Sequence, residues 1–166
     1  MVLILDETGM RVGNRAYTDR NGTYGLSNLR RKHLDARSKE LQFHYQGKSG
    51  KKREVVIDDP ELVKFIKHSA EQPGYEIFRY KDEEGNWSNV DSDELNAFIH
   101  EHMGEAYSSK YFRTWVACLL AVELYPEAIA ISETSKRKAL APTLVKLVAK
   151  ELGNTPAVCR AYYIHP

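Results

Sequence analysis

Two short stretches of this 166-residue chain carry residue types suited to chemistry, but the spacing of both is wrong for it. Gly47-Lys48-Ser49 looks like the end of a nucleotide-binding P-loop, but that motif needs a further glycine at the position of Gln42. In His100-Glu101-His102 the second histidine comes too early to share a helix face with the first, as a zinc-binding His-Glu-x-x-His pair must. The six histidines form no ligand cluster, so we predict packing or surface roles for them and no metal site.

A more specific signal comes from five short motifs that follow one another in a fixed order. They are Arg11-Val-Gly-Asn14, Tyr24-Gly-Leu-Ser-Asn-Leu-Arg-Arg-Lys-His33, Phe43-His-Tyr-Gln-Gly-Lys48-Ser-Gly-Lys51, Phe112-Arg113-Thr-Trp115 and Leu152-Gly-Asn-Thr-Pro-Ala-Val-Cys-Arg-Ala-Tyr-Tyr163-Ile-His-Pro166. Each motif is a weak signal alone. Together, at this spacing, they resemble the type IB DNA topoisomerases, in particular the bacterial, poxvirus-like branch. The resemblance covers essentially the whole chain.

The resemblance implies a catalytic set of two arginines, a lysine, a histidine or asparagine, and a tyrosine. In this sequence the set falls on Arg11, Lys48, Arg113, Asn154 and Tyr163. The implied nucleophile is Tyr163, which directly precedes Ile-His-Pro. Its neighbour Tyr162 is the rival, but the family has a small residue at that position.

The implied roles agree with what phosphoryl transfer requires, which is mainly positioning and stabilisation of negative charge. Arg11 and Arg113 suit two phosphate clamps, because guanidiniums stay charged and grip phosphate oxygens bidentately. Asn154 can add a neutral amide donor. Tyr163 would attack the phosphorus, and Lys48 would protonate the departing 5′-oxygen as a general acid. The resemblance implies relaxation of supercoiled DNA through a 3′-phosphotyrosyl intermediate, without ATP, metal or other cofactor.

Other interpretations remain open for the residues and for the chain. Each of the five residues also has an ordinary structural interpretation. Arg11 could be a surface residue at a helix end, Lys48 a solvated lysine in a turn, and Arg113 an arginine stacked on Trp115. Asn154 could simply end a helix, and Tyr163 could belong to the core. A tyrosine recombinase shares the fold and the chemistry, but usually has His-x-x-Arg where this chain has Lys110 three residues before Arg113. The chain could also be a DNA-binding catalytic fragment with little turnover.

The charges are segregated along the chain although the net charge is only +1. Residues 1–53 have a balance of +7, residues 54–106 of −10, and residues 107–166 of +4. This segregation permits a positive face for double-stranded DNA, although charges that merely cover solvated surface explain it equally well. The cations that we predict to contact DNA are Arg15, Arg30, Arg31, Lys32, Lys51, Lys136 and Arg160.

The length suits one domain that needs no disulfide or metal to fold, and the two cysteines, Cys118 and Cys159, form no Cys-x-x-Cys pair. The sequence contains neither a signal peptide nor an apolar run of the ~20 residues that a membrane span needs. We therefore expect a soluble, reduced, cytoplasmic monomer, at the bacterial nucleoid if the resemblance holds. Residues 1–166 would be the catalytic domain alone, without the N-terminal clamp domain and C-terminal extension of the family.

The elements that must position these residues are predicted to be mostly helical with one small sheet, an α+β arrangement with the tyrosine recombinase/type IB topoisomerase catalytic fold. Period-two alternation over Leu41–Tyr45 and Arg53–Ile57 predicts a β-hairpin with the catalytic lysine, Lys48, at its tip. A third strand is expected at Tyr75–Tyr80, ended by the turn Asp82–Gly85.

Helix signals cover much of the remaining sequence. Capping patterns predict that helices begin at Pro60 and Ser92, the first running to about His68 and the second ending at Gly104. The other expected segments are the end of a helix within residues 1–12 stopped by Gly13-Asn14, a loop at 19–25, a helix over Ser108–Tyr125 followed by Pro126, a helix over Ser135–Leu152 stopped by Gly153-Asn154, and a loop or short helix at Thr155–Pro166. Trp115, Cys118, Leu119 and Val122 are expected on the buried face of their helix.

Overall fold

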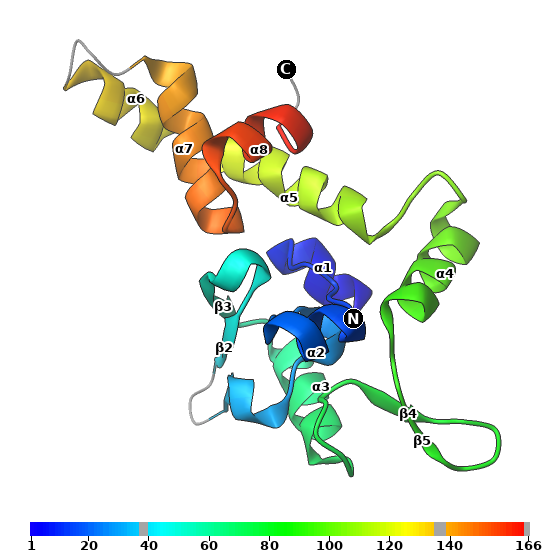
Figure 1. Cartoon of the computed structure of the whole chain (residues 1–166). Coiled ribbons are helices and arrows are strands. Elements are labelled where there is room, and N and C mark those ends of the chain that lie inside the picture. Colours follow the sequence, from blue (N-terminus) through cyan, green and yellow to red (C-terminus); the bar gives the residue numbers. More distant parts are fainter. Residues whose placement is uncertain (37–39, 135–138, 165–166) are drawn as a thin grey trace.

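A computed structural model describes residues 1–36, 40–134 and 139–164 of the chain. These residues form a mainly helical α+β structure with two small antiparallel sheets (Figure 1). The helices are α1 (Val2–Thr8), α2 (Arg15–Asn21), α3 (Pro60–Glu71), α4 (Ser92–Met103), α5 (Ser109–Glu123), α6 (Tyr125–Glu133), α7 (Leu140–Leu152) and α8 (Pro156–Tyr162), with 3-10 turns η1 (Leu26–Asn28), η2 (Arg31–His33) and η3 (Lys48–Gly50). The expected fold class is therefore confirmed.

The larger sheet contains the predicted hairpin. Its strands are β1 (Leu34–Asp35), β2 (Leu41–Gln46) and β3 (Lys52–Ile57), in the order β1-β2-β3. Along β2 every second side chain is buried, which follows from the alternation of side chains in a strand. The strand pair nearest the tip is Gln46 with Lys52, and the next is Tyr45 with Arg53. Lys48 is the first residue of the turn η3 at the tip. The hairpin thus presents its lysine at the end of a strand pair whose base is in the core.

Two hydrophobic cores lie on either side of the point where α1 packs against α5. The larger core is formed by α1, the β2–β3 hairpin, α3 and α4, with Phe43 and Ile66 fully buried. The smaller core belongs to α5, α7 and α8 and contains Val116, Leu152 and Tyr163. Figure 1 shows helices α5 to α8 above α1, α2 and α3 below it, and the hairpin to its left. A site whose residues come from both halves must therefore form along this junction.

Several sequence predictions of local structure are confirmed, among them the helix beginning at Pro60, N-capped by Asp59, and the helix ending at Gly104. The third strand expected at Tyr75–Tyr80 overlaps an observed strand only at its end, and the expectation of one small sheet is wrong. Residues Arg79–Lys81 form β4, which pairs with β5 (Trp87–Asn89) in a separate two-stranded sheet. Of the helix expected over Ser135–Leu152, residues 135–138 lie outside the described residues. The observed helix, α7, begins at Leu140 and ends at Leu152 as expected.

Two helices were not predicted because their signals are ambiguous. Asn14 was interpreted as the end of a helix, but its side chain accepts a hydrogen bond from the Ala16 N–H and so caps the start of α2. The helix predicted before it ends earlier, at Gly9. Pro126 was interpreted as following a helix end, and it instead occupies the first turn of α6, where its missing N–H costs nothing.

The buried face of α5 is also different from the predicted one. Trp115, Leu119 and Val122 are 56%, 48% and 77% exposed, whereas Phe112 and Val116 are buried together with the charged Arg113. The apolar stripe was therefore assigned to the wrong side of the helix, since the true inner face includes a guanidinium. Within the described residues no single helix is long and apolar enough to cross a membrane; only α5 with α6 would be, as a pair bent by 50°.

Candidate active site

Arg11 lies in the segment between α1 and α2, which backbone hydrogen bonds hold to the second motif. The Leu26 N–H donates to the Arg11 carbonyl at 2.8 Å, and the Ser27 N–H donates to the Val12 carbonyl at 2.7 Å. The two segments come so close at Gly13 and Gly25 that a Cβ on Gly25 would stand 2.6 Å from the Cα of Gly13. The glycines of the first two motifs are therefore needed for one close backbone contact. This contact fixes the position of the Arg11 backbone, from which the side chain extends.

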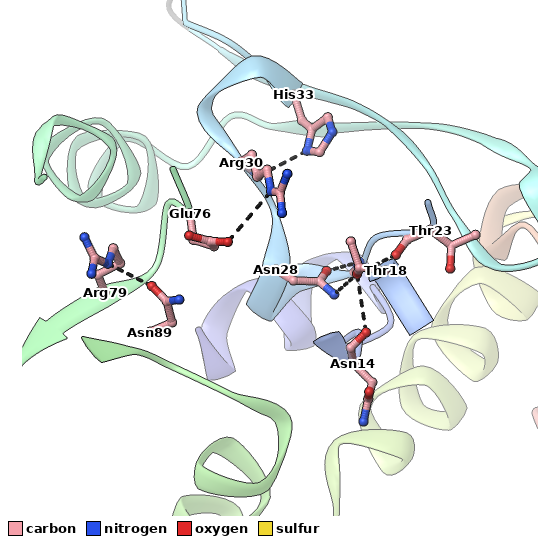
Figure 2. Close-up of polar contacts among 10 residues, drawn as sticks. Asn14, Thr18, Thr23, Asn28, Arg30, His33, Glu76, Arg79 and Asn89 are labelled. Carbon is pink, nitrogen blue, oxygen red and sulfur yellow. Dashed lines mark hydrogen bonds and ion pairs between the residues drawn. The ribbon is translucent and has the colours of Figure 1, made fainter. Parts of the chain in front are cut away.

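A buried polar network supports this contact from the side of α2 (Figure 2). The side-chain Nδ2 of Asn28 donates to the Thr18 hydroxyl at 2.6 Å, and the Oδ1 of the same side chain accepts from the Gly25 N–H at 2.7 Å. The Thr18 hydroxyl in turn donates to the Thr23 carbonyl at 2.8 Å. Both Thr18 and Asn28 are buried, so the network anchors the Arg11 segment rather than presenting groups to solvent.

Arg11 and Asn154 meet although 143 residues separate them in the sequence. The Arg11 Nη2 donates to the Asn154 Oδ1 at 2.5 Å, which is a short bond. Asn154 directly follows Gly153, the left-handed residue that ends α7. Because Oδ1 is the acceptor, the Asn154 Nδ2 group is left as the donor. The bond joins the first motif to the last.

Arg113 is a buried cation, only 5% exposed, on the inner face of α5. Its Nη1 donates to the Gly9 carbonyl, and its Nη2 donates to the Leu152 carbonyl at 3.0 Å. Burial, together with the charge of Arg11, lowers the pKa of Arg113 to about 10. The guanidinium therefore stays charged at neutral pH and joins the C-terminal ends of α1 and α7.

Tyr163 lies next to this guanidinium. The Arg113 Cζ stands 5.3 Å from the centre of the Tyr163 ring, and Tyr163 is 7% exposed in the smaller core. Burial by itself would raise the pKa of the phenol, but hydrogen bonding and charge from Arg113, followed by those of Arg11, outweigh it and lower the pKa. A tyrosine held against two guanidiniums is a tyrosine whose phenolate is favoured.

Tyr162, the alternative nucleophile, has a different environment. Its ring is 64% exposed and lies 5.7 Å from the Nζ of Lys110, on the outer side of α5. The two tyrosines are therefore distinguished by burial and by the cations that they contact.

Lys48 is exposed at the hairpin tip and shares a pocket with the arginines. Arg11, Lys48 and Arg113 line this pocket, whose wall also includes Gly153 at the end of α7. Arg11 and Lys48 line a second, adjoining pocket as well. The structure thus brings the two arginines, the asparagine and the tyrosine into contact and places the lysine across a small opening from them.

Two buried donors of this site have no hydrogen-bond partner among the described residues. They are the Nε of Arg113 and the Nδ2 of Asn154; Arg30 Nε is the third such atom, and it forms an ion pair with Glu76 at 3.7 Å. An unpaired buried donor costs roughly 1–3 kcal/mol. Oxygen atoms of a phosphate would satisfy both donors, and the charge of the neighbouring guanidiniums favours an anion.

The cations predicted to contact DNA have varied surroundings. Arg15 and Arg160 are exposed, and Arg31 donates to the Gln72 carbonyl. Arg30 is half-buried; it and Lys32 lie 5.7 and 5.5 Å from the centre of the Tyr24 ring. Lys51 donates to the Asn154 carbonyl at 3.3 Å, which places it at the site itself. Lys136 lies outside the described residues.

Two tyrosines at the site were not singled out from the sequence. Tyr24 and Tyr45 both line the pocket with Arg11 and Lys48. Burial raises the pKa of Tyr45 in spite of the nearby arginines, so it stays protonated. The signal available for Tyr24 was its place at the head of the second motif. The signals available for Tyr45 were its place in the third motif, three residues before Lys48, and its place on the inner face of a strand.

Among the residues that the structure describes, no group of three or more histidine, cysteine, aspartate or glutamate side chains could hold a metal ion. The positive charge that the described residues bring to the site is that of Arg11, Arg113 and the nearby lysines. His33, which is buried, has its pKa lowered to about 4 by burial and by Lys32 and Arg30, and it accepts a hydrogen bond from the Arg30 N–H.

Comparison with known proteins identifies a family and a relative of this chain. The sequence profile of a family described as the catalytic core of eukaryotic DNA topoisomerase I matches residues 1–164. A protein of Acanthamoeba polyphaga mimivirus named DNA topoisomerase 1B is 31% identical over 99% of this chain. The aligned part is 51% of the viral protein, so the chain spans about half the length of this relative.

Proposed function

Because the chain belongs to the DNA topoisomerase I catalytic-core family, we propose that it relaxes supercoiled double-stranded DNA by cleaving and rejoining one strand. The observation that carries this proposal is the environment of Tyr163. A buried phenol with a lowered pKa lies against Arg113 and near Arg11, beside two buried donors that lack partners. This arrangement suits a nucleophile whose target is a phosphodiester. The family match does not favour a recombinase.

In the proposed reaction Tyr163 first loses its hydroxyl proton to solvent, which the lowered pKa favours; the phenolate oxygen then attacks the phosphorus, and the bond from phosphorus to the 5′-oxygen breaks. Lys48 gives its proton to that oxygen, which leaves as a 5′-hydroxyl, while the 3′-phosphate becomes linked to the tyrosine. Arg11, Arg113 and the Asn154 amide stabilise the charge on the non-bridging oxygens. The reverse reaction rejoins the strand, because the phosphotyrosyl bond keeps the energy of the phosphodiester.

We propose that exposed cations around the site hold the DNA by its phosphates, among them Arg15, Lys32, Lys51 and Arg160. The bases would then be largely unread, since phosphate contacts carry no sequence information. A monomeric state and the bacterial nucleoid as the place of action remain predictions from the resemblance. The similarity to a viral protein supports the activity and not the host.

Relaxation should need neither metal nor nucleotide. Supercoiled plasmid incubated with the chain at low salt in EDTA, without ATP, should be converted to relaxed topoisomers, as seen on an agarose gel. Low salt is chosen because affinity for phosphates falls steeply as salt rises. The Tyr163→Phe variant at the same concentration is the control. Plasmid that stays supercoiled at high protein concentration would instead support a DNA-binding fragment with little turnover.

The pH dependence of cleavage should identify Asn154 as the non-titrating donor. Asn154 should contribute no step to the pH profile of the wild-type cleavage rate, since an amide does not titrate near pH ~6.5. Asn154→Ala should therefore remove no step from that profile. Asn154→His should introduce a step, with activity falling as pH rises, because the imidazolium is the better donor. The step should lie below pH ~6.5, since Arg11 disfavours a second cation beside it. Single-turnover cleavage between pH 5 and 9 measures both; a wild-type step abolished by Asn154→Ala would contradict the assignment.

A further inference from the structure

The C-terminal end of α7 receives hydrogen bonds from three cations on other elements. Arg53 Nη2 donates to the Glu151 carbonyl at 2.9 Å, Arg113 Nη2 to the Leu152 carbonyl at 3.0 Å, and Lys51 Nζ to the Asn154 carbonyl at 3.3 Å. The last carbonyls of a helix have no partner within it, and positive charge is favoured at that end. The turn before Asn154 is therefore held to the β2–β3 hairpin on one side and to α5 on the other.

Arg53 is on the inner face of the hairpin. It pairs with the buried Tyr45. It also lies on the same face of β3 as Val55 and Ile57, whose side chains are buried in the larger core. The Arg53 side chain thus starts from the core face of β3, two residues beyond Lys51, and extends to the end of α7. It also lines the pocket that contains Lys48.

The guanidinium of Arg53 packs directly on Gly153. A Cβ at Gly153 would stand 2.7 Å from the Arg53 Cζ, so any side chain there would displace the arginine. Gly153 also has a φ of +66°, which other residues adopt at a cost. The turn that orients Asn154 and the position of Arg53 are therefore matched to each other.

We propose that Arg53 is a positioning residue for Asn154 and, through the hairpin, for the placement of Lys48 relative to it. By fixing the Gly153 turn, Arg53 directs the Asn154 Oδ1 to Arg11 and leaves the Nδ2 for the phosphate. This inference rests on the proposed strand-cleavage function. Arg53 itself need not touch the DNA, since its side chain contacts other residues of the protein: the Tyr45 hydroxyl, the Glu151 carbonyl and the surface of Gly153.

The test compares Arg53→Met with Arg53→Lys and Lys52→Met in single-turnover cleavage at saturating DNA. Arg53→Met should slow cleavage by roughly 10–100-fold, because small misplacements of catalytic groups cost this much. Arg53→Lys should recover part of the rate, since an ammonium can still reach one carbonyl. Lys52→Met is the matched control, because Lys52 is the adjacent exposed cation on the opposite face of β3, and it should leave the saturated rate unchanged.

A double-mutant cycle separates positioning from a general structural role. In the Asn154→Ala background, Arg53→Met should have a much smaller effect than in the wild type, because residues that act through one another are not additive. Equal effects in the two backgrounds would overturn the proposal. If Arg53→Met lowers the melting temperature too far for assay, the same cycle is run with Arg53→Lys, and the same comparison decides.

A measurement that does not depend on cleavage keeps this inference distinct from the proposed function. The side-chain amide resonances of Asn154, assigned by their loss in Asn154→Ala, should shift in Arg53→Met and stay in place in Lys52→Met. Unchanged resonances in Arg53→Met would refute the positioning role. A wild-type chain that cleaves no DNA would refute the proposed function, and the resonances would still report on Arg53.

Discussion

Replacing Tyr163 by phenylalanine should abolish covalent capture of a suicide duplex, with a loss of roughly 10⁴-fold or more in adduct formation. The change removes only the hydroxyl. The ring would keep its place in the core with Val116 and Leu152 and its contact with Arg113, so the fold and the affinity for DNA should be retained. The hydrogen bonds of the hydroxyl with Arg113 and Arg11 are lost with it, but a loss of this size is the one expected for a missing nucleophile.

The measurement uses a duplex in which the strand beyond the cleavage site is short enough to dissociate after cleavage. The protein–DNA adduct is then trapped and resolved on a denaturing gel. Tyr162→Phe is the matched control, since Tyr162 is adjacent, 64% exposed and in contact with Lys110 rather than with the arginines. Adduct formation by Tyr163→Phe together with its loss in Tyr162→Phe would reverse the assignment.

The β2–β3 hairpin and the start of α3 could be predicted from the sequence because their signals are local. Alternation of buried and exposed residues gives the β2–β3 hairpin, and the glycines around Lys48 give its turn. Asp59 and Pro60 define the start of α3 because a side-chain acceptor and a preset φ act within one turn. Such predictions hold whenever nothing distant competes with them.

Ambiguous signals account for the local errors. Asn14 and Pro126 each fit both the end of one helix and the start of the next, and only the neighbouring packing decides between the two. The outward apolar stripe of α5 misled the burial prediction, because it competes with the inner apolar spacing of Phe112 and Val116, which Arg113 interrupts with a charge. The two-residue strand β1 is too short to carry any alternation.

The composition of the site followed from family resemblance, whereas its geometry required the fold. No local pattern indicates that Arg11 would bond Asn154, or that Arg113 would bond carbonyls of both α1 and α7. These contacts depend on how α1 packs against α5 and how α5 packs against α7. The same is true of Arg53, which in the sequence is one of three consecutive basic residues and in the structure is the one that faces inward.

Replacing Arg113 by lysine should slow cleavage by roughly 10²–10³-fold at saturating DNA, which is the usual effect of losing one preorganised donor to a developing charge. Lysine would keep the charge but cannot donate to two carbonyls and a phosphate at once, because it lacks the planar fork of arginine. The variant should also be less stable. One buried carbonyl, of Gly9 or of Leu152, would lose its partner, at about 1–3 kcal/mol.

Lys110→Met is the matched control, because Lys110 is on the same helix with its charge on the exposed side, over Tyr162. It should leave both the saturated rate and the melting temperature nearly unchanged, since surface substitutions usually change stability by less than about 0.5 kcal/mol. Thermal unfolding and single-turnover cleavage are measured on the same preparations. If Arg113→Lys is destabilised but cleaves at the wild-type rate, Arg113 only joins α1, α5 and α7. If cleavage falls while most of the protein remains folded, the guanidinium acts in the cleavage reaction as well as in joining these helices.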